Sequence, residues 1–420
     1  MAIIPSFGEE SNKTSRKKRG ADSEREEISQ VSESRADSNA NANTNSNKDS
    51  EPRLEQSNAQ LPSGKRSTVL SAGETAADVR NDAALRPSTL SEYIGQSRLK
   101  AMMQMSIAAA KSRGEALDHV LFYGPPGLGK TTLSRVIANE MNAKIHLTSG
   151  PSLERPRDII GLVHQLEAHD VLFIDEIHRL SRVAEELLYP AIEDFAIDLT
   201  SGKGHATRTM RLDLPKFTLI GATTKAGMIS NALRDRFGFV CRLEFYTHEE
   251  LGLIVARTSG ILGIELTDEA VHVVASRARG TPRIANRLVR LVRDYAHYCG
   301  QAIVDKELAA AALTSYQIDS SGLDPTDRRF LQILIDHYNG GPVGIETIAA
   351  TLGEDSDTLE DVYEPFLIQN GFLQRTPRGR AVTPLAYTHL NRTVPAALQA
   401  MQALQLNLEL NNGQNSADDK

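Results

Sequence analysis

The stretch Gly124-Pro-Pro-Gly-Leu-Gly-Lys-Thr131 fits the phosphate-binding pattern G-x-x-x-x-G-K-[ST] in full. The apolar run 120–123 before it suits a buried strand, and residues 132–142 after it carry apolar side chains at helical spacing. In such a strand–loop–helix unit, backbone N–H groups and the helix N-terminus face the phosphates. Lys130 then contacts the outer phosphates, and the Thr131 hydroxyl can hold Mg²⁺. The stretch therefore predicts that the chain binds ATP or GTP.

The composition predicts a largely globular protein of two to three domains. The chain has 420 residues, of which 40% are hydrophobic, and a formal net charge of −7. This acidic balance argues against a generally basic nucleic-acid coat, so that any DNA contact must be local. The two cysteines, Cys241 and Cys299, cannot make a disulfide framework. Together with the lack of a membrane-spanning run or a secretory signal pattern, they lead us to expect a cytoplasmic protein.

The chain divides into segments of different character. Residues 1–68 are polar and nearly free of aromatics, which predicts a disordered extension. Apolar strands then alternate with helices over 69–247, as in a parallel sheet covered on both faces. We expect its strands at 120–123, 144–148, 171–174, 217–222 and 240–243. Within this region, residues 196–214 read as a β-hairpin, either a surface decoration or a docking arm.

Two further units follow the sheet domain. Residues 248–318 read as all helix: one helix after a Thr247 capping box, one from Thr267 to Gly280, and one opened by Thr281-Pro282 and running to Gly300. Residues 319–396 show a winged-helix pattern. Its helices are expected at 328–338, 345–352 and 358–370, and its two strands at 372–375 and 380–383. The tail, 397–420, is predicted to be flexible.

A second motif places two acids after a buried strand. Val171–Ile174 is apolar and is followed by Asp175 and Glu176. In a phosphate-loop fold the first acid lies opposite Thr131 and helps to hold the metal, while the second can polarise the attacking water. By itself, the motif fits an acidic turn after a core strand better. Its pairing with the phosphate loop favours the catalytic interpretation.

Other polar residues lie where they could face the γ-phosphate. Thr224 follows an apolar strand that is expected between the two strands already described. Arg236 could reach a neighbouring subunit's phosphate, although in isolation a surface salt bridge with Asp235 is favoured. Arg283 lies in the first turn of the helix that Thr281 caps, where the helix dipole disfavours a cation. Its position indicates an anion nearby.

The predicted wing concentrates basic residues. The stretch between Gly371 and Arg392 contains no acid and four arginines, Arg375, Arg378, Arg380 and Arg392. Such a patch suits contact with a phosphate backbone, and a solvated hairpin is the alternative.

These motifs resemble those of the AAA+ ATPases and, within them, those of the bacterial RuvB family of Holliday-junction branch-migration motors. The resemblance spans about residues 69–395 and rests on 124–132, 175–180, 221–224, 233–238, 279–287 and 371–380. It implies an α/β AAA+ P-loop domain with a parallel sheet, an all-α lid domain and a C-terminal winged-helix domain. The polar extension and the tail fall outside the family pattern.

The resemblance also implies roles for residues. Lys130, Asp175, Glu176, Thr224 (sensor 1) and Arg236 (an arginine finger acting in trans) would be catalytic, with Arg283 as sensor 2 and Thr131 and Asp175 at Mg²⁺. The nucleotide contacts that it implies are Leu85, Arg86, Tyr93, Ile94, Gly127, Gly129, Lys130, Thr131, Thr132, Glu193, Asp194, Phe195, Tyr246 and Arg283.

Partners follow from the same resemblance. It implies a homohexameric ring on duplex DNA, ATP as the fuel, docking of the 196–214 hairpin on RuvA, and junction resolution by RuvC. Arg375, Arg378 and Arg380 would grip duplex DNA. Two alternatives remain: a clamp-loader-type ATPase, against which the basic wing argues, and a non-enzymatic, nucleotide-gated DNA-binding regulator. The set of Asp175, Glu176, Thr224 and Arg236 argues against the latter.

Overall fold

The computed structural model describes residues 84–201, 208–396, 398 and 399. The predicted disordered extension, 1–68, therefore lies outside the described residues. So do most of the predicted flexible tail, 397–420, and the turn of the predicted hairpin.

A five-stranded parallel sheet forms the centre of the first domain, as predicted. Its strand order is β2-β3-β6-β1-β7. The strands span Ile145–Ser149 (β2), Val171–Asp175 (β3), Thr218–Thr223 (β6), Val120–Tyr123 (β1) and Phe239–Arg242 (β7). Each end lies within one residue of the prediction. The sheet places β6 between β3 and β1, so that the ends of the phosphate-loop strand and of the acid-bearing strand flank the end of β6.

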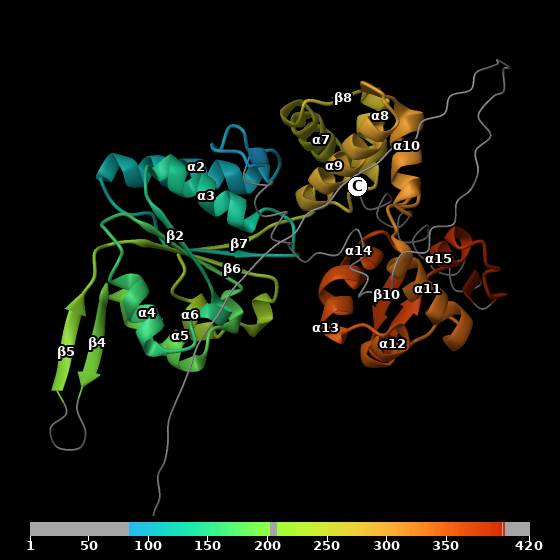
Figure 1. Ribbon diagram of the computed structural model, residues 1–420. Coiled ribbons are helices and arrows are strands. Elements are labelled where there is room, and N and C mark those ends of the chain that lie inside the picture. Colours follow the sequence, from blue (N-terminus) through green and yellow to red (C-terminus); the bar gives the residue numbers. More distant parts are fainter. Residues whose placement is uncertain (1–83, 202–207, 397, 400–420) are drawn as a thin grey trace, which may run out of the picture. The chain divides into compact units, whose positions relative to one another are not determined.

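Helices cover both faces of this sheet (Figure 1). Helices α2 (Ser97–Arg113) and α3 (Lys130–Met141) lie on one face. Helices α4 (Pro156–Val163), α5 (Arg182–Glu193) and α6 (Asn231–Arg234) lie on the other. Alternate strand residues enter two different cores: Phe122 and Phe173 pack with α3, whereas Leu121 and Leu172 pack with α5. Burial of both faces explains why these strands are apolar without a break.

The predicted β-hairpin is present. Strands β4 (Ala196–Ser201) and β5 (Arg208–Asp213) pair antiparallel, with Ala196 opposite Asp213 and Ser201 opposite Arg208. They form a two-stranded sheet of their own, which Figure 1 shows extending away from the central sheet. Met210 on β5 is 61% exposed. The hairpin therefore presents this side chain to solvent, whereas Ile197 at its base is buried in the core of the sheet domain.

The lid consists of α7 (His248–Leu262), α8 (Asp268–Ser276), α9 (Pro282–Tyr298) and α10 (Lys306–Ser315). The predicted caps are confirmed, because the side chains of Thr247, Thr267 and Thr281 each accept a backbone N–H of the first turn. The prediction that α8 reaches Gly280 is wrong. It ends at Ser276, and Arg279 and Gly280 adopt left-handed φ values of 54° and 66°. A two-residue parallel pair, β8 (Glu265–Leu266) with β9 (Ile303–Val304), was not predicted.

The last unit is a winged-helix domain, as predicted. Helix α11 (Pro325–Tyr338) begins three residues before the predicted start, because Asp324 caps it and Pro325 occupies its first position. Helix α12 (Ile345–Leu352) has the predicted bounds. The third helix comprises α13 (Ser356–Thr358), a π-helical turn (Leu359–Tyr363) and α14 (Glu364–Gln369). The wing strands are β10 (Leu373–Thr376) and β11 (Gly379–Val382), followed by α15 (Pro384–His389).

Candidate functional site

A cavity between the sheet domain and the lid collects most of the residues that were predicted to bind a nucleotide. Those that line it are Leu85, Arg86, Tyr93, Ile94, Gly127, Gly129, Lys130, Thr131, Thr132, Asp175, Glu176, Thr224, Tyr246 and Arg283. They come from the segment before α2, the phosphate loop and the start of α3, the ends of β3 and β6, the segment before α7, and the first turn of α9. Segments that are far apart in the sequence thus line one cavity.

The phosphate loop owes its shape to three glycines with positive φ, Gly124 (143°), Gly127 (82°) and Gly129 (98°). A Cβ atom on Gly129 would lie 2.8 Å from the Tyr93 hydroxyl oxygen, so a side chain there would both strain the backbone and enter the cavity wall. Lys130 begins α3, and its Nζ donates to the carbonyl oxygens of Gly124 (2.8 Å) and Pro125 (3.0 Å). Burial lowers the pKa of Lys130 to about 8. Phosphate oxygens would favour its charged form.

The ends of β3 and β6 bring an acid and a hydroxyl together. The Glu176 Oε2 atom accepts hydrogen bonds from the Thr224 N–H (3.3 Å) and hydroxyl (3.2 Å). His178 Nδ1 lies 3.1 Å from the same oxygen and 2.9 Å from the Thr223 hydroxyl. Asp175 accepts the Glu176 N–H at 3.0 Å. Glu176 is therefore fixed at the cavity edge, beside Lys130 and Thr131.

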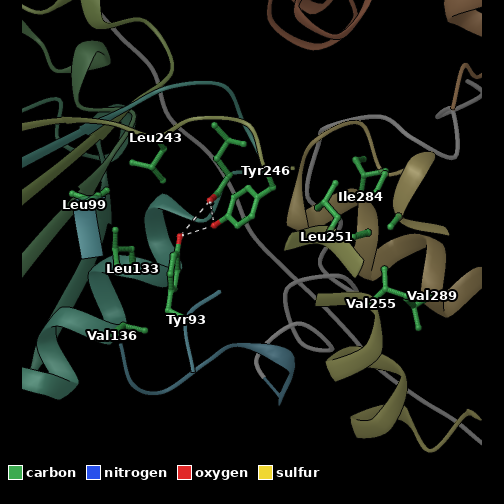
Figure 2. Close-up of a cluster of buried hydrophobic side chains, with 14 of the residues drawn as sticks. Tyr93, Leu99, Leu133, Val136, Leu243, Tyr246, Leu251, Val255, Ile284 and Val289 are labelled. Atoms are coloured by element: carbon green, nitrogen blue, oxygen red, sulfur yellow. Dashed lines mark hydrogen bonds between the residues drawn. The ribbon is translucent and has the colours of Figure 1, made fainter. Parts of the chain in front are cut away.

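A buried pair of tyrosines forms one wall. The Tyr246 hydroxyl donates to the Tyr93 hydroxyl (3.0 Å) and lies 3.3 Å from the Leu128 carbonyl (Figure 2). Burial raises the pKa of Tyr93 to about 12 and raises that of Tyr246 as well, so both stay neutral. The pair joins the segment before α2 to the segment before α7. Its neutral rings give the cavity an apolar side that suits a nucleotide base.

The lid directs the start of α9 at the phosphate loop. The Arg283 backbone N–H points at the Gly127 carbonyl (3.4 Å), and Arg283 is the second residue of a helix capped by Thr281. Arg283 lines the cavity, and the anion that its position at a helix N-terminus indicates stays a prediction.

Four of the residues predicted to be catalytic or to contact the nucleotide lie elsewhere. Arg236 contacts Glu193 (2.9 Å from Nε and 2.7 Å from Nη2), stacks on Tyr189 and does not line the cavity. The alternative prediction paired Arg236 with Asp235, whereas the structure pairs it with Glu193. Nor do Glu193, Asp194 and Phe195 line the cavity. Helix α5 ends at Glu193, and Phe195 turns the chain into β4 with its ring against Phe217. These three residues therefore lie outside this chain's own cavity, and their contact with a nucleotide stays a prediction.

The wing arginines differ in their surroundings. Arg375 and Arg380 both pair with Glu364 at 2.9 Å, and Glu364 is 2% exposed. They also contact Glu360, and the Arg380 side chain is 12% exposed. Both hold β10 and β11 against the third helix. Arg378, in the turn between the strands, is exposed.

Comparison with known proteins identifies the family. A family model for the Holliday junction DNA helicase RuvB P-loop domain matches residues 85–243. The RuvB AAA lid domain matches 246–319, and the RuvB C-terminal winged helix domain matches 320–391. The chain belongs to the RuvB family. Its P-loop domain, AAA lid and winged helix are those of this family, and a RuvB-family P-loop domain implies nucleotide binding.

Solved structures agree with this assignment. The RuvB Holliday junction branch migration motor of Thermotoga maritima is 48% identical, with a TM-score of 0.69; the match covers 74% of this chain and 100% of that chain. Two mutants of that RuvB, also 48% identical, match over 74% of this chain and 99% of theirs, with TM-scores of 0.70 and 0.68. Among the described residues, no helix has both the length and the apolar character needed to cross a bilayer.

Sequence reasoning missed several residues of the RuvB-family cavity. Ile254 and Arg257 on α7, and Asn286 on α9, line it beside the predicted residues. Arg257 also donates to the Leu85 carbonyl oxygen at 2.6 Å, which ties the lid to the segment before α2. Within their helices these residues are ordinary partly exposed positions. Only the folding of the lid against the sheet domain distinguishes them from their neighbours.

Proposed function

We propose that this chain is an ATP-hydrolysing motor that drives branch migration of four-way DNA junctions in recombination and repair, working as a hexameric ring on duplex DNA. The observation that carries the proposal is the hydrogen bond of Glu176 to Thr224 beside Lys130, in a cavity shared by the sheet domain and the lid. A carboxylate fixed there can orient water, and closure of the cavity by the lid can move a domain.

The phosphate end of the cavity is built for binding. In the proposed reaction, loop N–H groups and Lys130 hold the β- and γ-phosphates, and Lys130 leaves its present carbonyl partners to do so. Thr131 and Asp175 are oxygen donors on the same cavity and would hold Mg²⁺, which neutralises phosphate charge when bound. The described residues contain no group of three or more His, Cys, Asp or Glu side chains that could hold a metal ion. Mg²⁺ usually takes several of its ligands from water and substrate phosphates.

Hydrolysis requires a positioned water. Glu176 orients it for in-line attack on the γ-phosphorus, the bond to the β-phosphate oxygen breaks, and ADP and phosphate leave. Thr224 keeps the carboxylate aligned through its two hydrogen bonds. Arg236 lies outside its own cavity, which supports action on the nucleotide of the adjacent subunit, and Glu193 holds its guanidinium until the ring assembles.

The hairpin and the wing would serve the partners. The β4–β5 hairpin carries an exposed Met210 away from the core, which supports docking on RuvA, while RuvC would act on the same junction.

Contact of the winged-helix unit with DNA would be local. The winged-helix unit, 319–396, contains eleven acidic residues against six arginines and no lysine. A phosphate backbone would therefore meet the unit at the wing, where Arg378 is exposed.

The wing assignment makes a separable prediction. Arg378→Ala should weaken binding of duplex DNA uniformly across sequences and lower the slope of log K against log salt by about one, since one phosphate contact is lost. The melting temperature of the Arg378→Ala variant should equal that of the wild type. Arg380→Ala should instead lower stability, by about 1.5–3 kcal/mol, because the buried Glu364 loses a charge-assisted hydrogen bond and keeps only Arg375 of its two arginine partners. Fluorescence anisotropy across a salt series and thermal melts measure the two effects. Equal salt slopes for Arg378→Ala and wild type would refute the contact.

One experiment tests the function as a whole. The wild-type chain, with ATP and Mg²⁺, should convert a synthetic four-way DNA junction into duplex products, and addition of RuvA should increase the yield. Lys130→Ala should yield no product, because the γ-phosphate then lacks its main cation. Failure of the wild type to displace the junction, with and without RuvA, would favour a clamp-loader-type switch or a DNA-binding regulator. Appreciable ATP hydrolysis by Lys130→Ala would refute the assignment of the site.

A further inference from the structure

The strand end after β6 contacts the winged-helix unit as well as the nucleotide cavity. Thr224 donates two hydrogen bonds to Glu176. The next residue, Lys225, places its Nζ atom 3.1 Å from Asp361 and 3.7 Å from Asp357. The Lys225 N–H also donates to the Thr223 hydroxyl at 3.0 Å. Three consecutive residues thus connect the carboxylate that would orient water to an acidic segment of another domain.

That acidic segment is the third helix of the winged-helix unit. It and the turn before it carry Glu354, Asp355, Asp357, Glu360, Asp361 and Glu364. A phosphate backbone repels a helix surface with this charge. Its acidic side chains are therefore expected to pair with Lys and Arg side chains of the protein. Its π-helical turn, Leu359–Tyr363, also faces the phosphate loop, since Asp361 and Pro126 line the same small cavity. π-helical turns are frequent at functional sites.

A second ion pair joins the winged-helix unit to the lid, and it is of a different kind. The guanidinium of Arg279 lies 3.2 Å from Asp324, also contacts Asp327, and stacks on Phe366 at 4.7 Å. Its side chain is 5% exposed and both carboxylates are fully buried. Breaking a buried pair of this sort is strongly unfavourable. Arg279 therefore forms a strong link between the lid and the winged-helix unit.

The Lys225 pair is built to open. The side chains of Lys225 and Asp361 are 27% and 34% exposed, and ion pairs with such access to water are weak. The Arg279 ion pair joins the winged-helix unit to the lid four residues before Arg283, which lines the nucleotide cavity. Any shift of Thr224 when the γ-phosphate leaves must also move Lys225, since the two residues are adjacent in the chain.

We propose that Lys225 is a positioning residue that couples the nucleotide state of the cavity to the winged-helix unit through its ion pair with Asp361. The inference rests on the proposed function, because it presumes a nucleotide in the cavity. Its consequence is that the third helix responds to the γ-phosphate at a distance, without touching the nucleotide.

Hydrogen–deuterium exchange of residues 356–364 tests the coupling in the full chain. Addition of a non-hydrolysable ATP analogue should change the exchange rates of this segment about fivefold or more in the wild type. Lys225→Met, which keeps the apolar stem and removes the charge, should respond less than about twofold, and Asp361→Asn should do the same. The charge exchange of Lys225→Asp with Asp361→Lys should restore the response. Lys306→Met, an exposed lysine on α10, serves as the matched control and should behave like the wild type.

The outcomes separate this inference from the proposed function. Equal responses in the wild type and in Lys225→Met would overturn the coupling, and so would a wild type that binds the analogue without any change in residues 356–364. Loss of the response in both single variants, with recovery in the charge exchange, would support it. A wild type that binds nucleotide but neither hydrolyses ATP nor displaces junctions would overturn the motor function, and the exchange measurement would still decide the coupling.

Discussion

Replacement of Arg236 by alanine should lower the kcat of ATP hydrolysis by about 10³-fold or more, the range expected for loss of an arginine finger. ATP affinity should stay within about twofold, because the residue does not line its own cavity. The fold should tolerate the change: Glu193, the partner that would be lost, is 59% exposed, and such pairs contribute about 1 kcal/mol or less. Steady-state hydrolysis and binding of a fluorescent ATP analogue measure the two effects. Arg182→Ala, a 90% exposed arginine on α5, is the matched control.

A mixing experiment decides whether Arg236 acts in trans. Arg236→Ala subunits keep an intact Lys130, and Lys130→Ala subunits keep an intact Arg236. If each site combines the Lys130 of one subunit with the Arg236 of its neighbour, mixed rings contain some complete sites. The mixture should then hydrolyse ATP faster than either variant alone. Two inactive variants that remain inactive when mixed would contradict action between subunits, and an Arg236→Ala variant with normal turnover would contradict the role itself.

Glu176→Gln should lower kcat by about 10²- to 10⁴-fold, the usual contribution of a positioned general base. The amide matches the carboxylate in size and can still accept hydrogen bonds from Thr224, so the KM for ATP should change little. The variant should therefore accumulate with ATP bound. Rapid-quench single-turnover measurements would show whether the chemical step itself has slowed.

The matched control for Glu176 is Glu186→Gln, which changes a 57% exposed glutamate on α5 in the same way. It should hydrolyse ATP at the wild-type rate. A Glu176→Gln variant that turns over ATP within about threefold of the wild type would exclude general-base catalysis by this residue. A large rise in KM with unchanged kcat would instead assign Glu176 to nucleotide binding.

Local patterns in the sequence predicted most of the fold. Apolar runs marked the five parallel strands to within a residue, because strands buried on both faces must be apolar along their length. Threonines followed by acids or proline marked the starts of α7, α8 and α9, since helix caps are satisfied by side chains a few residues away. The predicted end of α8 was wrong, because no local pattern in the sequence indicates the left-handed conformation of Arg279. Arg279 is held by Asp324 and Asp327, which lie in the winged-helix unit.

Local patterns likewise predicted only part of the candidate site. Glycine spacing, two acids after an apolar strand and a threonine at the end of another were sufficient to predict that Lys130, Glu176 and Thr224 share one site, because parallel strands end at one edge of their sheet. The tertiary structure alone placed Arg257 and Asn286 in the cavity, since their selection depends on how the lid packs. It also placed Glu193 beside Arg236 and away from the cavity.

The sequence by itself thus determined the chemistry that is available: a phosphate loop, two acids, a hydroxyl and a set of arginines. The tertiary structure decided which of these charges meet. In the sequence, nothing distinguishes Arg375 and Arg380 from Arg378. In the structure, Glu360 and Glu364 of the neighbouring helix pair with Arg375 and Arg380. Lys225 finds Asp361 more than a hundred residues away. Pairing over such distances depends on packing of whole domains, because no local hydrogen bond or hydrophobic period encodes it.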